Sequence, residues 1–195
     1  MLVAIEGLDG SGKSTIIKAL SKILRKRGLN VFTTSEPTDG PIGKIIKQYL
    51  AKENRSRDIR MEALLFAADR IWHVNNVIKP MLEKGGIVIT DRYKYSSLAY
   101  QAMSSKDEKW VEEINKFVPE ANLAFFIDVT PENCIKRLNL SKRKKSIMEN
   151  LKNLKKVYER YLKLVKRGKL IRINGEKDVQ SISGEIAWFI LEKLS

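Results

Sequence analysis

Short apolar runs recur along the chain and predict β-strands, each bounded by polar or glycine-containing segments. The runs cover residues 2–6, 31–34, 87–90, 123–128 and 170–173. Between them, apolar residues repeat every three or four positions, the spacing that places side chains on one face of a helix. Because strands and helices alternate, the pattern predicts an α/β fold with an open parallel five-stranded sheet and helices on both faces.

The helical segments begin and end at residues typical of helix boundaries. The first helix begins near Lys13 and ends at Gly28, and Pro41 opens a second helix. We expect the buried side of that second helix to hold Ile42, Ile45, Ile46, Tyr49 and Leu50. Further helices are expected at about 59–83, 96–103, after Pro131, at 147–165 and at 182–190. In the 147–165 segment, we expect residues 147, 151, 154, 158, 161 and 165 to face the core.

Length and composition favour one cytoplasmic domain. A chain of 195 residues with 43% hydrophobic content can bury one sizeable core, so a single domain over residues 1–195 is expected. No apolar run approaches the roughly 18–20 residues needed to span a bilayer, and the first apolar run does not resemble a secretory signal. The single cysteine, Cys134, excludes an internal disulfide framework. We therefore expect no membrane partner.

The net charge of +14 is concentrated in residues 136–169, which hold 14 Lys or Arg and two acids. A basic block of this kind can bind nucleic acid, or it can be the solvated face of helices beside a site for anions. Residues 139–146 contain no aromatic side chain, and the apolar stripe of 147–165 is needed by the core. These features favour the second interpretation and no stable nucleic-acid partner.

The first apolar run leads into a glycine-rich turn that matches the P-loop pattern G-x-x-x-x-G-K-[ST]. The turn consists of Gly7, Leu8, Asp9, Gly10, Ser11, Gly12, Lys13, Ser14 and Thr15. Its backbone N–H groups and the following helix N-terminus suit phosphate oxygens. Lys13 would reach the β- and γ-phosphates, and the Ser14 hydroxyl would hold Mg²⁺. The motif therefore predicts a P-loop NTPase-type fold that binds a nucleoside triphosphate.

Other polar residues also follow predicted strands. Asp91 ends one strand and fits the carboxylate that completes the Mg²⁺ shell opposite Ser14. Alternatively, Asp91 is a turn or cap residue. Arg92 beside it can form a fork onto two phosphate oxygens. Glu36-Pro37 and Asp128 also follow strands, and ligands of such sheets bind beyond the carboxyl ends of the strands. We expect all of these to meet the P-loop in one crevice. An Asn-Lys-x-Asp element is absent, which argues against a GTPase.

Taken together, the motifs resemble the thymidylate kinase family in order and spacing. The segments that carry the resemblance are 7–15, 36–43 (Glu-Pro-Thr-Asp-Gly-Pro-Ile-Gly), 64–70 (Leu-Leu-Phe-Ala-Ala-Asp-Arg), 91–93 with 96–101, and 156–162. The resemblance covers nearly the whole chain. It implies transfer of a phosphoryl group from ATP–Mg²⁺ to the 5′-phosphate of dTMP, a short mobile lid at 139–146, and a homodimer.

The resemblance also implies roles for individual residues. Phe66 would stack on thymine, Arg70 would donate to thymine O4, and Ser97 or Gln101 would lie near the base edge. Asp9 would reach the sugar 3′-OH, Tyr100 would crowd the 2′ position, and Glu36 and Pro37 would belong to the substrate-binding segment. Lys13, Asp91, Arg92 and a lid cation, with Arg143 as first choice, would act in catalysis, and Arg137 would lie beside adenine. Alternatively, Phe66 is plain core and Arg70 pairs with Asp69 or Glu62 on the surface. His73 and Cys134 are interpreted as structural.

Two positions depart from the family pattern. Ser35 stands where thymidylate kinases often have Arg, and Gly10 stands where some members carry a P-loop Arg. Members without that P-loop Arg are expected to supply the charge from the lid. Three other functions stay open: a sibling kinase with different nucleoside monophosphate specificity, a deoxynucleoside kinase, and an ATP-dependent nucleic-acid-binding protein.

Overall fold

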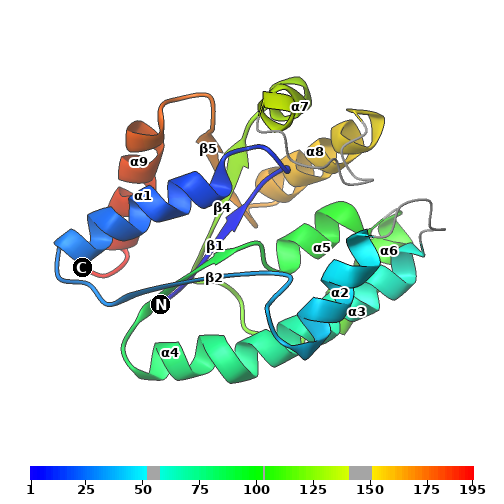
Figure 1. Cartoon of the computed structure of the whole chain (residues 1–195), viewed down its shortest axis with the longest axis horizontal. Coiled ribbons are helices and arrows are strands. Elements are labelled where there is room, and N and C mark those ends of the chain that lie inside the picture. The colour runs from blue at the N-terminus through cyan, green and yellow to red at the C-terminus, as the bar shows by residue number, and fades with distance from the viewer. Residues whose placement is uncertain (52–57, 103, 141–150) are drawn as a thin grey trace.

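Five parallel strands form an open sheet in the order β2-β3-β1-β4-β5 (Figure 1). The computed structural model describes residues 1–51, 58–102, 104–140 and 151–195. The strands are β1 (Leu2–Glu6), β2 (Val31–Ser35), β3 (Ile87–Asp91), β4 (Leu123–Asp128) and β5 (Ile171–Asn174). Each predicted apolar run is therefore a strand, and the predicted parallel five-stranded α/β fold is confirmed.

Helices cover both faces of this sheet. They are α1 (Lys13–Lys26), α2 (Pro41–Ala51), α3 (Ile59–His73), the π-helical η1 (Val74–Ile78), α4 (Lys79–Glu83), α5 (Lys94–Tyr100), α6 (Ser105–Ile114), α7 (Pro131–Leu140), α8 (Leu151–Lys166) and α9 (Val179–Glu192). Figure 1 shows α1 and α9 packed together on one side of the sheet, with α5, α8 and the continuous run from α3 to α4 on the other. Within the described residues, none of these helices has the length and apolarity required to cross a membrane.

The central strand β1 determines where the functional loops meet. All its residues are buried, as expected for a parallel strand covered on both faces. Ile5 of β1 is in register with Asp91 of β3, and the Ile5 carbonyl oxygen accepts a hydrogen bond from the Arg92 N–H at 3.0 Å. The loop after β1 and the loop after β3 therefore leave the sheet side by side.

The helices differ from the predictions in two places. Helix α5 spans Lys94–Tyr100 rather than 96–103. Helix α6 was not predicted, because few of its residues are apolar. Its N-terminus does carry a capping signal, since Ser104 Oγ accepts a hydrogen bond from the Asp107 N–H at 3.2 Å.

The buried faces of two helices are also shifted from the expected positions. In α2, Ile46 is buried but Ile45 is 53% exposed. In α8, the buried positions are 154, 157, 161 and 164, whereas Leu151 is exposed and residue 147 lies outside the described residues. The spacing of apolar residues alone did not distinguish the core side from a neighbouring stripe of each helix.

Candidate active site

The loop between β1 and α1 adopts a conformation suited to binding phosphate. Gly10 and Gly12 have φ angles of 86° and 92°, which glycine adopts without the steric cost that a side chain brings. A Cβ at Gly10 would also lie 2.5 Å from the carbonyl oxygen of Cys134 in α7. Gly12 is the N-cap of α1 and makes no side-chain capping bond, so no cap side chain competes for first-turn N–H groups that can bind an anion.

Lys13 is buried against this loop and faces the end of β3. Its Nζ donates to the carbonyl oxygens of Gly7 at 3.2 Å and Leu8 at 3.0 Å, and it lies 3.9 Å from a carboxylate oxygen of Asp91. Burial, followed by the positive charge of Arg92, lowers the pKa of Lys13. A polyphosphate beside Nζ would supply negative charge that offsets both effects.

Ser14 and Asp91 bring two oxygen ligands together at the edge of the loop. Ser14 Oγ donates to Asp91 Oδ2 at 3.0 Å. Mg²⁺ prefers oxygen ligands and is usually bound by one or two protein groups together with substrate phosphates and water. Among the described residues, no group of three or more His, Cys, Asp or Glu side chains could hold a metal ion. Ser14 and Asp91 supply two neighbouring oxygen atoms of the type that Mg²⁺ prefers.

Arg92 follows β3 with a φ angle of 75°, a conformation that non-glycine residues seldom adopt. Its Nη2 donates to Asp9 Oδ1 at 2.6 Å and to Tyr100 Oη at 3.3 Å, and its Nη1 donates to Ser96 Oγ at 2.9 Å. Its Cζ lies 4.9 Å from the centroid of the Tyr100 ring, within the range of a cation–π interaction. Arg92 is thus a largely buried cation between the P-loop and α5, with an acidic partner that a phosphate could replace.

Arg70 of α3 is fully buried and forms four hydrogen bonds and one further ion-pair contact. Its Nε and Nη2 contact Glu36 Oε2 at 2.8 and 2.7 Å, its Nη1 donates to Ser97 Oγ at 3.2 Å and to Asn115 Oδ1, and its Nη2 donates to the Tyr93 carbonyl oxygen at 3.3 Å. A guanidinium has five N–H donors, and four of them donate to the acceptors named here. The alternative in which Arg70 pairs on the surface is wrong.

Glu36 connects this arginine to His73. A cis peptide bond joins Glu36 to Pro37. Glu36 Oε1 lies 3.1 Å from His73 Nδ1, and His73 Nε2 lies 2.7 Å from Thr34 Oγ1. His73 is buried, and its contacts link β2 to α3. This agrees with its interpretation as a structural residue, although its partner Glu36 is a predicted site residue.

A cavity of about 410 Å³ runs from the P-loop to Arg92. Its lining includes predicted site residues from three separate loops and from α1 and α7: Asp9, Gly10, Gly12, Lys13, Ser14, Thr15, Glu36, Asp91, Arg92 and Arg137. Ser35 and Leu138 also line it. Gly7 and Leu8 contact Lys13, and Ser11 completes the loop with a buried Oγ that has no hydrogen-bond partner among the described residues.

The residues predicted to contact the base or to crowd the 2′ position do not line this cavity. Tyr100 contacts the lining residue Arg92, Arg70 contacts the lining residue Glu36, and Ser97 contacts Arg70. Phe66 is half-buried on α3, and Gln101 is the buried C-cap residue of α5. The roles of these residues, and of Pro37, toward a base stay predictions.

Three other predicted positions lie elsewhere or outside the described residues. Asp128 accepts a hydrogen bond from Arg172 Nε in β5 at 2.6 Å and does not line the cavity, so its expected place in the crevice is wrong. Arg137 Nη1 donates to the Ser11 carbonyl oxygen at 3.3 Å, which holds α7 against the P-loop. Arg143 and residues 141–146 of the expected lid lie outside the described residues, and residues 139–140 end α7.

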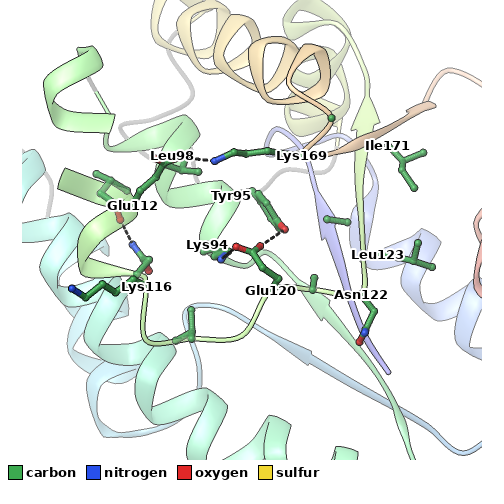
Figure 2. A pocket seen from close by; sticks show the side chains of 16 residues that line it. Lys94, Tyr95, Leu98, Glu112, Lys116, Glu120, Asn122, Leu123, Lys169 and Ile171 are labelled. Carbon is green, nitrogen blue, oxygen red and sulfur yellow. Dashed lines mark hydrogen bonds and ion pairs between the residues drawn. The ribbon is translucent and has the colours of Figure 1, made fainter. Parts of the chain in front are cut away.

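A larger cavity, of about 650 Å³, lies on the other side of α5 (Figure 2). Tyr95 and Leu98 of α5 line it, whereas Ser96 and Tyr100 of the same helix contact Arg92. Figure 2 shows Glu120 beside Tyr95, whose hydroxyl donates to it at 3.0 Å. The predicted substrate-binding residues do not line this second cavity, so α5 separates it from the candidate active site.

Sequence reasoning missed several residues that support the site. Glu6 and Tyr161 form a buried hydrogen-bonded group with Ser96, and Asn115 binds Arg70 from the end of α6. A signal existed for Glu6, because a charged residue that ends a fully buried strand needs partners. No comparable signal marked Asn115, since its contact with Arg70 depends on where α6 packs.

Comparisons with known proteins agree with this geometry. The family model for thymidylate kinase matches residues 5–186. A protein of Thermococcus onnurineus is 40% identical over 202 residues, which cover 100% of this chain and 98% of the relative. A protein of Thermococcus kodakarensis is 38% identical over 194 residues, with 95% of each chain covered, and one of Pyrobaculum calidifontis is 41% identical over 162 residues, with 83% and 81% covered. Each of the three is described as a probable thymidylate kinase.

Proposed function

The chain belongs to the thymidylate kinase family, and from this premise we propose that it uses the cavity between the P-loop and Arg92 to phosphorylate dTMP with ATP. The reaction transfers the γ-phosphoryl group of ATP to the 5′-phosphate of dTMP and yields ADP and dTDP. The observation that carries the proposal is one cavity lined by both Lys13 and Arg92. These cations can face the donor triphosphate and the acceptor phosphate respectively.

At the donor end, the P-loop backbone and Lys13 would bind the phosphates of ATP. Lys13 Nζ now donates to two loop carbonyls, and exchanging those neutral acceptors for phosphate oxygens forms stronger, charge-assisted bonds. Ser14 and Asp91 would hold Mg²⁺, which when bound neutralises charge on the phosphate oxygens. Arg137, already bonded to the P-loop at Ser11, would lie beside the adenine ring.

At the acceptor end, Arg92 would bind the 5′-phosphate of dTMP. In the structure its guanidinium pairs with Asp9, so an incoming phosphate would exchange one anion for another. Asp9 would then be able to accept a hydrogen bond from the sugar 3′-OH. Tyr100, stacked against Arg92, would fill the space beside the 2′ position. The protein supplies alignment of two anions and neutralisation of the charge that moves between them, and no protein nucleophile is required.

Base selection would depend on Phe66 and the cluster around Arg70. A thymine O4 would replace one neutral acceptor of Arg70, and the Ser97 hydroxyl at 3.2 Å is the candidate that lies on α5 beside the acceptor residues. Because the guanidinium only donates, the amino group of cytosine would have no acceptor there. Phe66, half-buried on the same helix as Arg70, would offer its ring to the base.

Three finer expectations also belong to this proposal. Arg143 would supply the lid cation that the P-loop lacks at Gly10. A homodimer would bury apolar side chains that are exposed on α2 and α3, namely Ile45, Met61, Leu64 and Ile71. Met61, Leu64 and Ile71 share one side of α3 at helical spacing. The cytoplasmic location expected from the sequence stays a prediction.

A panel of nucleoside monophosphates with ATP and Mg²⁺, read out as ADP release, tests the proposed reaction. We expect dTMP to be the preferred acceptor and thymidine to be inactive, because thymidine lacks the phosphate that Arg92 would bind. Turnover of thymidine would indicate a deoxynucleoside kinase instead. Preference for another monophosphate would indicate a sibling kinase. Arg92→Ala should lower kcat/KM for dTMP by at least about 100-fold and leave ATP binding largely intact.

A further inference from the structure

Glu6 is a fully buried carboxylate at the end of β1, directly before the P-loop. Its Oε1 accepts hydrogen bonds from the backbone N–H groups of Tyr93 at 2.8 Å and Ser96 at 3.2 Å. Its Oε2 accepts from Ser96 Oγ at 2.6 Å and Tyr161 Oη at 2.9 Å. Every one of these partners is a donor, which is the environment that an ionised carboxylate requires, because it has acceptor sites alone.

The two backbone bonds hold the segment that follows Arg92. Tyr93 is the N-cap of α5 and makes no side-chain capping bond. Glu6, distant in sequence, supplies the acceptor that an N-cap side chain normally provides. Because Arg92 has a left-handed backbone, which costs energy unless the surroundings hold it, these bonds lie where they can keep that backbone conformation in place.

The Oε2 contacts determine how Arg92 is held on its other side. The single hydroxyl hydrogen of Ser96 points to Glu6, so the lone pairs of Ser96 Oγ are left to accept from Arg92 Nη1 at 2.9 Å. Burial raises the pKa of Glu6, whereas the hydrogen bond from Ser96, the positive charge of Arg92 and the hydrogen bond from Tyr161 act in the opposite direction. Glu6, Ser96 and Arg92 therefore form one chain of hydrogen bonds with a defined direction.

From these contacts we propose that Glu6 is a positioning residue for the kinase reaction: it fixes the backbone and the guanidinium of Arg92 so that Arg92 faces the acceptor phosphate. The inference rests on the proposed role of Arg92 in binding dTMP. Glu6 itself lines neither cavity and acts through Ser96 and the start of α5.

Glu6→Gln keeps the shape of the side chain but replaces one acceptor oxygen by an NH₂ donor. We expect kcat/KM for dTMP to fall at least about tenfold, the effect of losing one charge-assisted hydrogen bond. The dissociation constant for ATP should change less than kcat/KM for dTMP, because Glu6 acts on Lys13 only through its charge, whereas it is hydrogen-bonded to Ser96. Glu120→Gln is the matched control, since Glu120 contacts Lys94 and Tyr95 on the opposite face of α5 (Figure 2), and it should leave both constants unchanged.

Ser96→Ala breaks the same chain without altering a buried charge, so it tests the inference even if Glu6→Gln fails to fold. Ser96→Ala alone should also lower kcat/KM for dTMP. The double variant with Glu6→Gln should lower kcat/KM by less than the product of the two separate fold-changes. Tyr161→Phe removes a hydroxyl that contacts Glu6 but not Arg92, and we expect a smaller loss. Wild-type kcat/KM in Ser96→Ala, or equal losses toward ATP and dTMP, would overturn the positioning role. If Arg92→Ala itself keeps a kcat/KM for dTMP close to the wild-type value, the proposed role of Arg92 fails instead.

Discussion

Substituting Arg92 by Gly and by Ala separates the contribution of its side chain from that of its backbone. The side chain makes two close charge-assisted contacts, to Asp9 at 2.6 Å and to Ser96 at 2.9 Å. If comparable contacts bind the acceptor phosphate, each contributes about 1.5–3 kcal/mol. Their loss then amounts to about 3–6 kcal/mol, or roughly a 10²- to 10⁴-fold drop in kcat/KM for dTMP. Both substitutions should show this drop.

Stability should respond differently to the two substitutions. Both substitutions remove the ion pair between Arg92 and Asp9. Because this ion pair is partly exposed, it contributes about 0–1 kcal/mol to the free energy of unfolding. The φ angle of 75° at position 92 costs an L-residue roughly 1–2 kcal/mol, a cost that Ala keeps and Gly avoids. We therefore expect Arg92→Gly to be more stable than Arg92→Ala by about 1 kcal/mol, which is a difference in Tm of about 2–4 °C for a chain of this size.

The activity assay follows ADP release at saturating ATP and varied dTMP, and thermal unfolding monitored by circular dichroism gives Tm. Calorimetric titration with ATP provides the control, because the contacts of Lys13 and Ser14 with the loop carbonyls and with Asp91 do not involve Arg92. The reasoning is refuted if Arg92→Gly retains kcat/KM close to the wild-type value. A higher Tm for Arg92→Ala than for Arg92→Gly would show that the left-handed backbone is not a source of strain.

Three further predictions concern the metal, the base and the oligomer. Asp91→Asn should raise the Mg²⁺ concentration needed for half-maximal activity by about 10- to 100-fold, measured by Mg²⁺ titration of the kinase assay; an unchanged midpoint would exclude Asp91 as a ligand. dUMP, which lacks one methyl group, should be used about 10- to 200-fold less efficiently than dTMP, and dCMP far less, so equal use of dUMP and dCMP would contradict the role of Arg70. Leu64→Glu should convert a dimer to a monomer in light-scattering measurements, because Leu64 is 52% exposed in the apolar stripe of α3. Leu194→Glu is the control and should leave the dimer intact, because Leu194 is 46% exposed near the C-terminus, away from that stripe.

The sequence was sufficient for the sheet and for the phosphate end of the site. Apolar runs identify strands that are buried on both faces, and the P-loop spacing identifies the turn after β1, because both depend on local chemistry. The resemblance also brought Phe66, Arg70 and Tyr100 into consideration, although the structure does not test their contacts with a nucleotide.

What sequence reasoning could not supply is the set of contacts between elements distant along the chain. The Glu6 group joins β1, α5 and α8, and Asn115 reaches Arg70 from a helix whose pattern is mostly polar. Asp128 shows the converse error. It follows a strand at the expected edge of the sheet, but Arg172 of the neighbouring strand binds its carboxylate, and the position of a residue after a strand does not reveal such a partner.

The close approach of Gly10 to the backbone of α7 restricts how this enzyme could change during evolution. A Cβ at position 10 would collide with the Cys134 carbonyl oxygen and with Leu138, so a single substitution to arginine would be selected against before its charge could be of use. Such an arginine could be fixed only after earlier changes had moved α7 away from the P-loop.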